Sequence, residues 1–66
     1  MITYGIKFKQ KLWFTDEKTG ERVLKEVDRW HNSKFGVATL YDTPGKAIGV
    51  AKRFHKEFVI VEVELN

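Results

Sequence analysis

Residue types that commonly do chemistry are sparse in this 66-residue chain. It has two histidines, His31 and His55, and no cysteine. A zinc site needs three or four ligands at characteristic spacings, and no such spacing occurs here. His31 and Ser33 lie two residues apart, as a base and a nucleophile can, and Asp28 or Asp42 would add a carboxylate. Residues of these types also occur together by chance. We therefore expect no catalytic site, no metal site and no cofactor.

Two further motifs have structural explanations. Glu62 and Glu64 lie two residues apart, a spacing that can pair an acid with a base, but an exposed strand face kept soluble by charge is the favoured explanation. Residues 43–46, Thr-Pro-Gly-Lys, resemble part of a phosphate-binding loop but lack its glycine spacing and its Lys-Ser/Thr ending. Instead, Thr43 can cap a helix that has Pro44 at its first position.

We next consider the secondary structure that would position these residues. The clearest periodic pattern lies in residues 57–66, EFVIVEVELN. Apolar residues alternate there with residues that become acidic, which predicts a strand with Val59, Val61 and Val63 on its buried face. Residues 44–55 carry an apolar stripe at helical spacing and predict the single helix.

The first part of the chain alternates from Ile2 to Phe14 and predicts a β-strand. A straight strand over residues 2–15 would be about 45 Å long, which is too long for so small a domain. We therefore expect either a strong bend near residues 9–11 or a turn there that splits the strand. Residues 16–20 predict a hairpin turn with Gly20 in the left-handed region.

The next segment, residues 21–30, is ambiguous. Its alternation predicts a strand, whereas the spacing of Val23, Val27 and Trp30 also permits a helix. The preceding turn favours a strand. Residues 31–34 predict a polar loop, and residues 35–41 predict a further short strand.

Together these elements predict one α+β domain over residues 1–66, in the order β-β-β-α-β. An antiparallel sheet of three to five strands carries the helix on one face. The expected core is Ile6, Phe8, Leu12, Val37, Leu40, Ala47, Ile48, Ala51, Phe54, Val59, Val61 and Val63.

Composition adds broad limits. The formal net charge is +3, which is only mildly basic. No apolar run approaches the roughly 18 residues needed to cross a bilayer, and the first residues lack the apolar centre of a signal peptide. We expect a soluble, cytoplasmic protein without a membrane partner.

Basic residues form the first candidate binding surface. If the strand lysines and the helix lysines lie on one side, they can bind phosphates, and the neighbouring Trp13 can stack on bases. The competing interpretation is that these cations are simply the solvated faces of a strand and a helix. The candidate nucleic-acid-binding residues are Lys7, Lys9, Lys11, Lys52, Arg53 and Lys56.

Aromatic residues form the second candidate surface, because one short helix covers only part of a sheet. Trp13, Trp30 and the start of the last strand, Phe58 and Ile60, can form an exposed patch supported by Arg29. Tryptophan and arginine are common anchors at protein interfaces. Burial of these residues in a second core layer or in a homodimer is the alternative.

Three segments carry a resemblance to a known group of proteins. They are residues 11–15 (KLWFT), residues 37–43 (VATLYDT) and residues 59–65 (VIVEVEL), with Ala47 and Ala51 on a basic helix between the last two. The pattern resembles small proteins encoded by bacteriophages of Gram-positive bacteria. Residues 21–30 are not part of it.

The resemblance implies an accessory phage protein that binds and inhibits or modulates a bacterial host protein, such as a defence or replication component. Our first functional hypothesis is therefore a non-enzymatic protein-binding module in the host cytoplasm, with Trp13, Arg29, Trp30 and Phe58 as its binding residues. A nucleic-acid-binding module is the alternative. The third hypothesis is a structural protein that forms a homodimer through its exposed sheet face.

Overall fold

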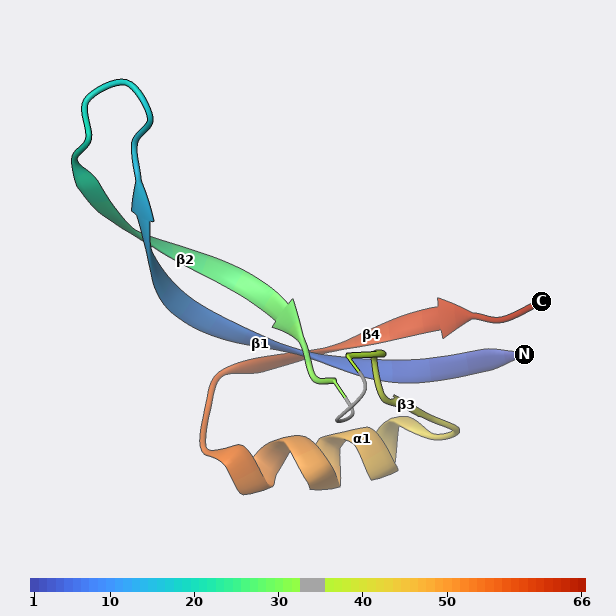
Figure 1. Ribbon diagram of the computed structural model, residues 1–66. Coiled ribbons are helices and arrows are strands. Elements are labelled where there is room, and N and C mark those ends of the chain that lie inside the picture. Colours follow the sequence, from blue (N-terminus) through green and yellow to red (C-terminus); the bar gives the residue numbers. More distant parts are fainter. Residues whose placement is uncertain (33–35) are drawn as a thin grey trace.

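Four strands and one helix make up the described part of the molecule (Figure 1). The computed structural model describes residues 1–32 and 36–66. The elements follow one another as β1 (Ile2–Thr15), β2 (Arg22–Trp30), β3 (Leu40–Tyr41), α1 (Pro44–Ala51), a 3₁₀ turn (Lys52–Phe54) and β4 (Phe58–Glu64). The predicted α+β class and the β-β-β-α-β order are confirmed.

β1 is the central strand, and every strand that pairs with it is antiparallel. β4 pairs with residues 2–8 of β1, and β3 pairs with Tyr4 and Gly5. β2 pairs with residues 7–15. Because a strand has only two edges, β4 must occupy one edge of β1, while β3 and β2 follow each other along the opposite edge.

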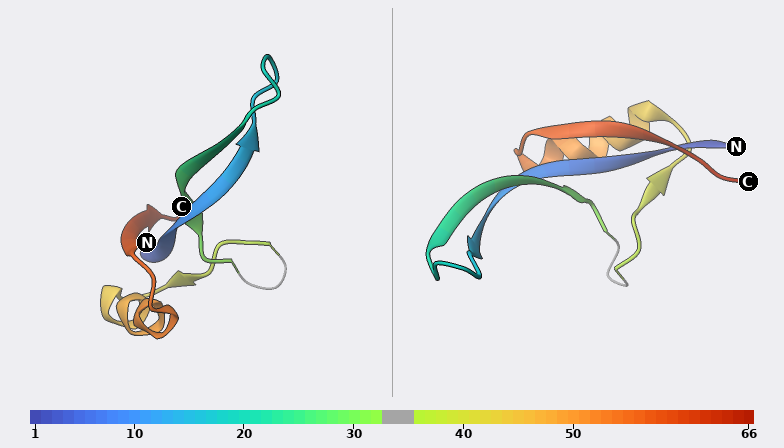
Figure 2. Two further views of the ribbon diagram at one scale, coloured as in Figure 1. Left: turned by 90° about the vertical axis from the view of Figure 1, so that its left-hand side faces the viewer. Right: turned by 90° about the horizontal axis from the view of Figure 1, so that it is seen from above.

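β1 is one continuous strand of 14 residues, so the predicted split near residues 9–11 is wrong and the predicted bend is present. Figure 2 shows the strand curving away from the rest of the sheet as it leaves α1 and β4. Beyond Phe8 only β2 accompanies it, and the two strands project as a hairpin. We call residues 9–28 the arm and the remaining described residues the body.

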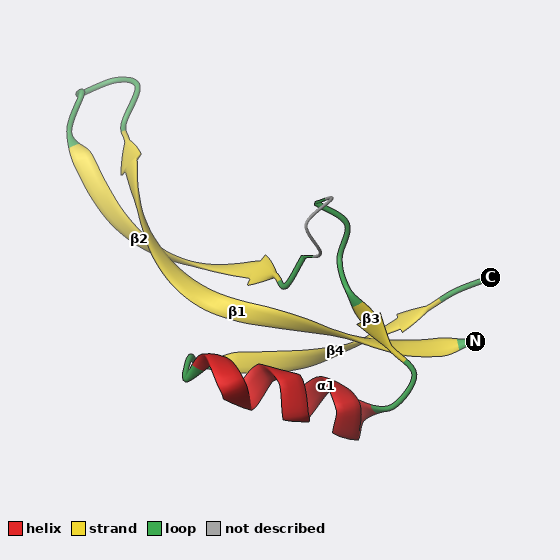
Figure 3. Ribbon diagram, turned by 60° about the horizontal axis from the view of Figure 1, so that its bottom comes forward, coloured by secondary structure: helices red, strands yellow, loops and turns green. Residues whose placement is uncertain are grey.

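The core lies in the body, between α1 and one face of the sheet (Figure 3). Its buried residues are Ile6, Phe8, Ala47 and Ala51. We call this side the helix face. Tyr4 and, from β4, Phe58 and Ile60 pack against the same cluster. Directly opposite residues of paired strands lie on one face, and Phe58 pairs with Phe8 as Ile60 pairs with Ile6.

The opposite side of the sheet, the open face, therefore holds Val59, Val61 and Val63, which pair with Lys7, Gly5 and Thr3. Val59 is 47% exposed and the other two valines are half-buried, so their prediction as core is wrong. Both faces of β4 are apolar at its start, so alternation alone could not say which face meets the helix.

Other predicted core residues also lie nearer the surface. Val37 is 66% exposed and Phe54 is exposed at the end of the 3₁₀ turn. Leu12, Leu40 and Ile48 are half-buried. Leu12 lies on the arm, past the end of β4, where no helix of the described chain covers it. The fully buried core is thus smaller than the sequence predicts.

The helix begins as predicted. The Thr43 hydroxyl accepts a hydrogen bond from the Lys46 N–H at 3.3 Å, and Pro44 is the first helical residue. The helix ends earlier than predicted, at Ala51, and the 3₁₀ turn is closed by His55 in the left-handed conformation with φ 52°. That turn reverses the chain into β4.

The predicted strand over residues 35–41 is shorter than expected. Only Leu40–Tyr41 form β3, and an isolated bridge joins Asn32 to Ala38. The predicted loop and strand positions 33–35 lie outside the described residues. In the part of the chain that the structure describes, no helix combines the length and apolar character needed to cross a membrane.

Candidate functional site

The arm ends in a turn that its own side chains hold. The Asp16 carboxylate accepts hydrogen bonds from the N–H groups of Lys18 at 2.8 Å and Thr19 at 3.3 Å. The Thr19 hydroxyl accepts one from the Glu21 N–H at 3.2 Å. Gly20 has φ 74°, as the sequence predicts, and its N–H donates to the Asp16 carbonyl. These bonds fix the turn, and with it the register of the side chains behind it.

Behind the turn, one surface of the arm carries Trp13. Leu24 of β2 lies directly opposite it, and the guanidinium of Arg22 lies 4.6 Å from the centre of the indole ring. Trp13 is nevertheless 57% exposed and Leu24 is also exposed. Cross-strand pairing and cation–π contact orient the indole while leaving most of it in water.

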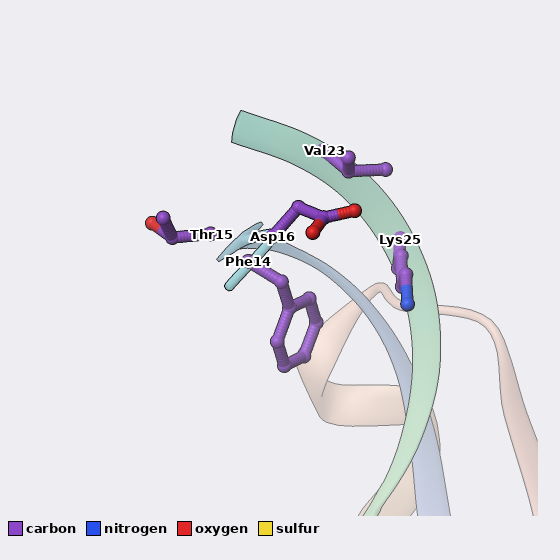
Figure 4. Close-up of a pocket in the computed structure, with 5 residues that line it drawn as sticks. All are labelled: Phe14, Thr15, Asp16, Val23 and Lys25. Carbon is purple, nitrogen blue, oxygen red and sulfur yellow. The ribbon is translucent and has the colours of Figure 1, made fainter. Parts of the chain in front are cut away.

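The other surface of the arm is apolar as well. Phe14 and Val23 face each other across the two strands and both are exposed, with the Lys25 ammonium 5.7 Å from the phenyl ring. Together with Thr15 and Asp16 these residues line a shallow pocket of about 170 Å³ (Figure 4). The pocket is smaller than the usual small-molecule site of about 300–1,000 Å³.

We call Trp13, Phe14, Val23 and Leu24 the tip cluster. All four are exposed apolar side chains, and they belong to both surfaces of the hairpin. The sequence analysis selected only Trp13. The other three could have been found from the strand register. Pairing the strands outward from the turn at residues 16–20 places Leu24 opposite Trp13 and Val23 opposite Phe14.

Trp30, the second predicted tryptophan anchor, has a different environment in the body. A Cβ atom built on Gly5 would lie 2.5 Å from the Trp30 ring and 3.3 Å from Leu40. One edge of the indole therefore lies directly over Gly5, and the Lys7 ammonium lies 4.7 Å from the ring centre. Trp30 thus packs on the open face and shields the backbone of Gly5 from solvent.

The four predicted protein-binding residues do not form one surface. Phe58 is half-buried against the core on the helix face, so its predicted exposure is wrong. Arg29 is exposed and pairs with Phe8, which places it on the helix face. Trp13 and Trp30 share the open face, but the register separates them by six residues, or about 20 Å.

The basic residues also divide between the two faces. Lys7, Lys9 and Lys11 share the side of β1 that carries Trp13. Lys56 lies on the helix face, with its ammonium 6.0 Å from the Phe8 ring, and Lys52 and Arg53 belong to the adjacent 3₁₀ turn. The six predicted nucleic-acid-binding residues therefore form two separate groups.

The strand group is also partly neutralised. The Lys9 ammonium lies 3.5 Å from a Glu57 carboxylate oxygen and 3.9 Å from one of Glu26, and Lys11 lies directly opposite Glu26. The whole arm holds five basic and five acidic residues, so its formal charge is zero and the net +3 of the chain lies outside it. A formally neutral arm has no net electrostatic attraction to phosphates.

The histidines, the serine and the aspartates that the sequence analysis considered for catalysis do not come together in one site among the described residues. The His31 ring packs against Phe8 and Phe54, with centroids 5.8 and 5.1 Å away, on the helix face. Asp28 pairs with Lys9 on the opposite side of the sheet. Ser33 lies outside the described residues, and His55 closes the 3₁₀ turn.

The remaining carboxylates that the sequence analysis considered for chemistry are those of Asp42, Glu62 and Glu64. Asp42 lies 2.9 Å from the Lys46 ammonium, and the hydrogen bond from Lys46 holds the pKa of that carboxyl below its usual value. Glu62 and Glu64 are exposed along one face of β4. Among the described residues there is no group of three or more metal-ligating side chains.

Comparison with known proteins adds no relative: no protein-family model, curated protein or solved structure matches this chain. The tip cluster is therefore the candidate site on physical grounds alone. It combines exposed apolar area with a turn that fixes its shape.

Proposed function

We propose that the chain is a non-enzymatic protein-binding module that presents the tip cluster to its partner. The observation that carries this proposal is the exposure of four large apolar side chains at the end of an arm whose turn is held by its own hydrogen bonds. Exposed large apolar side chains gathered at one end of a molecule are typical of protein interfaces, and tryptophan is among the residues that contribute most there.

The shape of the molecule supports the proposal. A compact domain of 66 residues has a radius of gyration of about 11 Å, whereas this chain has 14.8 Å. A monomer of its mass typically exposes about 4,300 Å², whereas it exposes 5392 Å². The excess of about 1,100 Å² is comparable to the roughly 800 Å² that one partner contributes to a standard interface.

The charge of the arm favours a protein over a nucleic acid. Its zero formal charge gives no long-range attraction to phosphates, while Arg22 and Lys25 beside the rings offer charged groups at the rim of the apolar cluster. The resemblance to small phage proteins adds a partner class, a bacterial host protein whose activity the bound arm would block or alter.

The test is capture from bacterial lysate with nuclease present, using the tagged wild-type chain and two variants. Trp13→Ala combined with Leu24→Ala should abolish capture of the partner while circular dichroism shows an intact fold. Lys52→Ala, at an exposed position on the body, is the matched control and should capture as the wild type does. Equal capture by the tip variant would overturn the proposal.

Nucleic acid is the second candidate partner, supported by Lys52, Arg53 and Lys56 at the end of the helix. No described residue forms an ion pair with them. This alternative predicts retention on DNA or RNA that weakens steeply with salt and is lost when Lys52 and Arg53 are changed to glutamate. Retention that survives this charge reversal would count against it.

A further inference from the structure

β4 has one edge that no described strand covers. Its other edge bonds to β1 through its odd-numbered residues: the Lys9 N–H donates to the Glu57 carbonyl at 3.1 Å, and the Leu65 N–H donates to the Met1 carbonyl at 2.8 Å. In an antiparallel ladder, alternate residues bond to opposite edges. The even-numbered residues of β4 therefore direct their N–H and C=O groups outward.

These outward residues are Phe58, Ile60, Glu62 and Glu64. The edge that they form is seven residues long and contains no proline or glycine. β2 differs, because five of its nine residues are charged, against two of the seven in β4. Natural proteins protect exposed strand edges with charges, prolines or bulges, and an unprotected apolar stretch pairs readily with another strand. On this edge Glu62 and Glu64 supply charges in the second half, whereas residues 58–61 contain none of these features.

We propose that this edge pairs with β4 of a second copy of the chain, antiparallel, about a two-fold axis through Val61. In that register Ile60 pairs with Glu62 of the second copy and Phe58 pairs with Glu64 of the second copy. All four outward residues then bond to outward residues, giving about eight inter-strand hydrogen bonds. The two sheets become one, with β4 strands at its centre.

The side chains fit this register. Each glutamate of one strand lies opposite an apolar residue of the other, and all seven residues of β4 are paired. Moving the axis one residue to either side leaves part of β4 unpaired, and moving it to Glu62 places two carboxylates directly opposite each other, which is unfavourable. Val59, Val61 and Val63 of both copies join into one apolar stripe on the open face.

Pairing with a second copy would also bury further apolar surface of the body, whose own core is small. Among the described residues only four hydrophobic side chains are buried, and Ile6 is the one large side chain of this set that is fully buried. Small domains with so little core are commonly stabilised by association. Isologous pairing about a two-fold axis closes the assembly at two chains, so the exposed edge is used up rather than extended.

The arms remain free in this dimer, because within each arm β1 pairs with β2 and not with β4. The inference is therefore separate from the proposed function. The tip variant Trp13→Ala should lose its partner but stay dimeric, and a variant impaired at β4 should be monomeric with an intact tip cluster.

The test uses the absence of cysteine from the chain. Two residues facing each other in a non-hydrogen-bonded antiparallel pair have Cα atoms about 4.5 Å apart, within the range for a disulfide. Val61→Cys should therefore give a covalent dimer under mild oxidation, reversed by reductant. Val59→Cys is the matched control on the same strand and face, and it should stay uncrosslinked although Val59 is more exposed.

Sedimentation of the wild-type chain over a range of concentrations completes the test, and a dimer at the higher concentrations is expected. A wild-type chain that stays monomeric throughout overturns the proposal. A dimer in which Val59→Cys crosslinks as well as Val61→Cys, or better, also overturns it, because the β4 register would then be wrong.

Discussion

The two halves of β1 share one sequence pattern and have different surroundings. In residues 2–8 the large apolar side chains occupy even-numbered positions, and Leu12 and Phe14 continue this parity in residues 9–15. In the first half β4, β3 and α1 surround the strand and Ile6 and Phe8 are buried, whereas in the second half β2 is the single neighbour and Trp13 and Phe14 stay exposed. Alternation determines that a strand forms, and the other elements determine whether its apolar side is covered.

Beyond the pairing of its two strands, the arm is held in place by interactions at its two ends. An isolated two-stranded hairpin is marginally stable in water. Here the same strand continues into the body, and Lys9 forms ion pairs with Glu26 of the arm and Glu57 beside β4. The body therefore fixes the base of the arm, while the bonded turn fixes its end.

Truncation of one apolar residue in each half gives the largest expected contrast. Ile6→Ala removes a fully buried side chain and should cost about 2–5 kcal/mol of unfolding free energy, enough to unfold much of so small a domain. Leu12→Ala, at a half-buried arm position, should cost clearly less. Urea unfolding followed by circular dichroism measures both, and equal losses would show that the arm is part of the core.

Gly5→Ala tests the packing on the open side of the body half. The new methyl group would meet the Trp30 ring at 2.5 Å, so the indole must shift, and we expect a loss of about 1–3 kcal/mol. Gly49→Ala is the matched control, because nothing lies within 4 Å of its added Cβ and alanine favours the helix by up to about 1 kcal/mol. Thermal unfolding should move in opposite directions for the two variants.

In the arm half, Trp13→Ala should have a smaller effect. The indole is mostly exposed, and its cross-strand and cation–π contacts are each worth about 1 kcal/mol or less. The same urea measurement should show a loss of that size or smaller. A loss as large as that of Ile6→Ala would mean that the tip cluster holds the fold together and is not a free surface.

The smallest effect is expected at an exposed ion pair of the body. The hydrogen bond from Lys46 lowers the pKa of Asp42, so the stability that the pair contributes is present above the pKa of the unfolded carboxyl and is lost as pH falls through the folded pKa. Lys46→Gln should raise the pKa of Asp42 toward its usual value in an NMR titration. An unchanged pKa would show that the two side chains do not interact in solution.

Much of the fold follows from local patterns in the sequence. The turn at residues 16–20 resolved the ambiguous segment as a strand, and Thr43 with Pro44 located the start of the helix. The face of β4 that meets α1 could not be predicted in the same way. Both of its faces begin with apolar residues, and its pairing with Ile6 and Phe8, which lie 50 or more residues away in the sequence, determines which face meets the helix.

The candidate site was less predictable than the fold. Trp13 and Trp30 look alike in the sequence, and the difference between them is Gly5, which leaves room for the Trp30 indole to approach the strand closely. Similarly, the lysines of β1 and of the helix end look like one basic surface until the register assigns them to opposite faces. Both distinctions depend on contacts between segments distant in the sequence.

The pairing of β1 with β4 also has a consequence for biosynthesis. β2 follows β1 directly, so the arm hairpin can close while the chain is still being made, whereas β4 begins only at Phe58. Until then, the edge of residues 2–8 that β4 will cover remains open. Long-range strand pairing is slow, and an open apolar edge makes nascent chains aggregate. The yield of this protein in a cell should therefore depend on how quickly its last strand reaches its first.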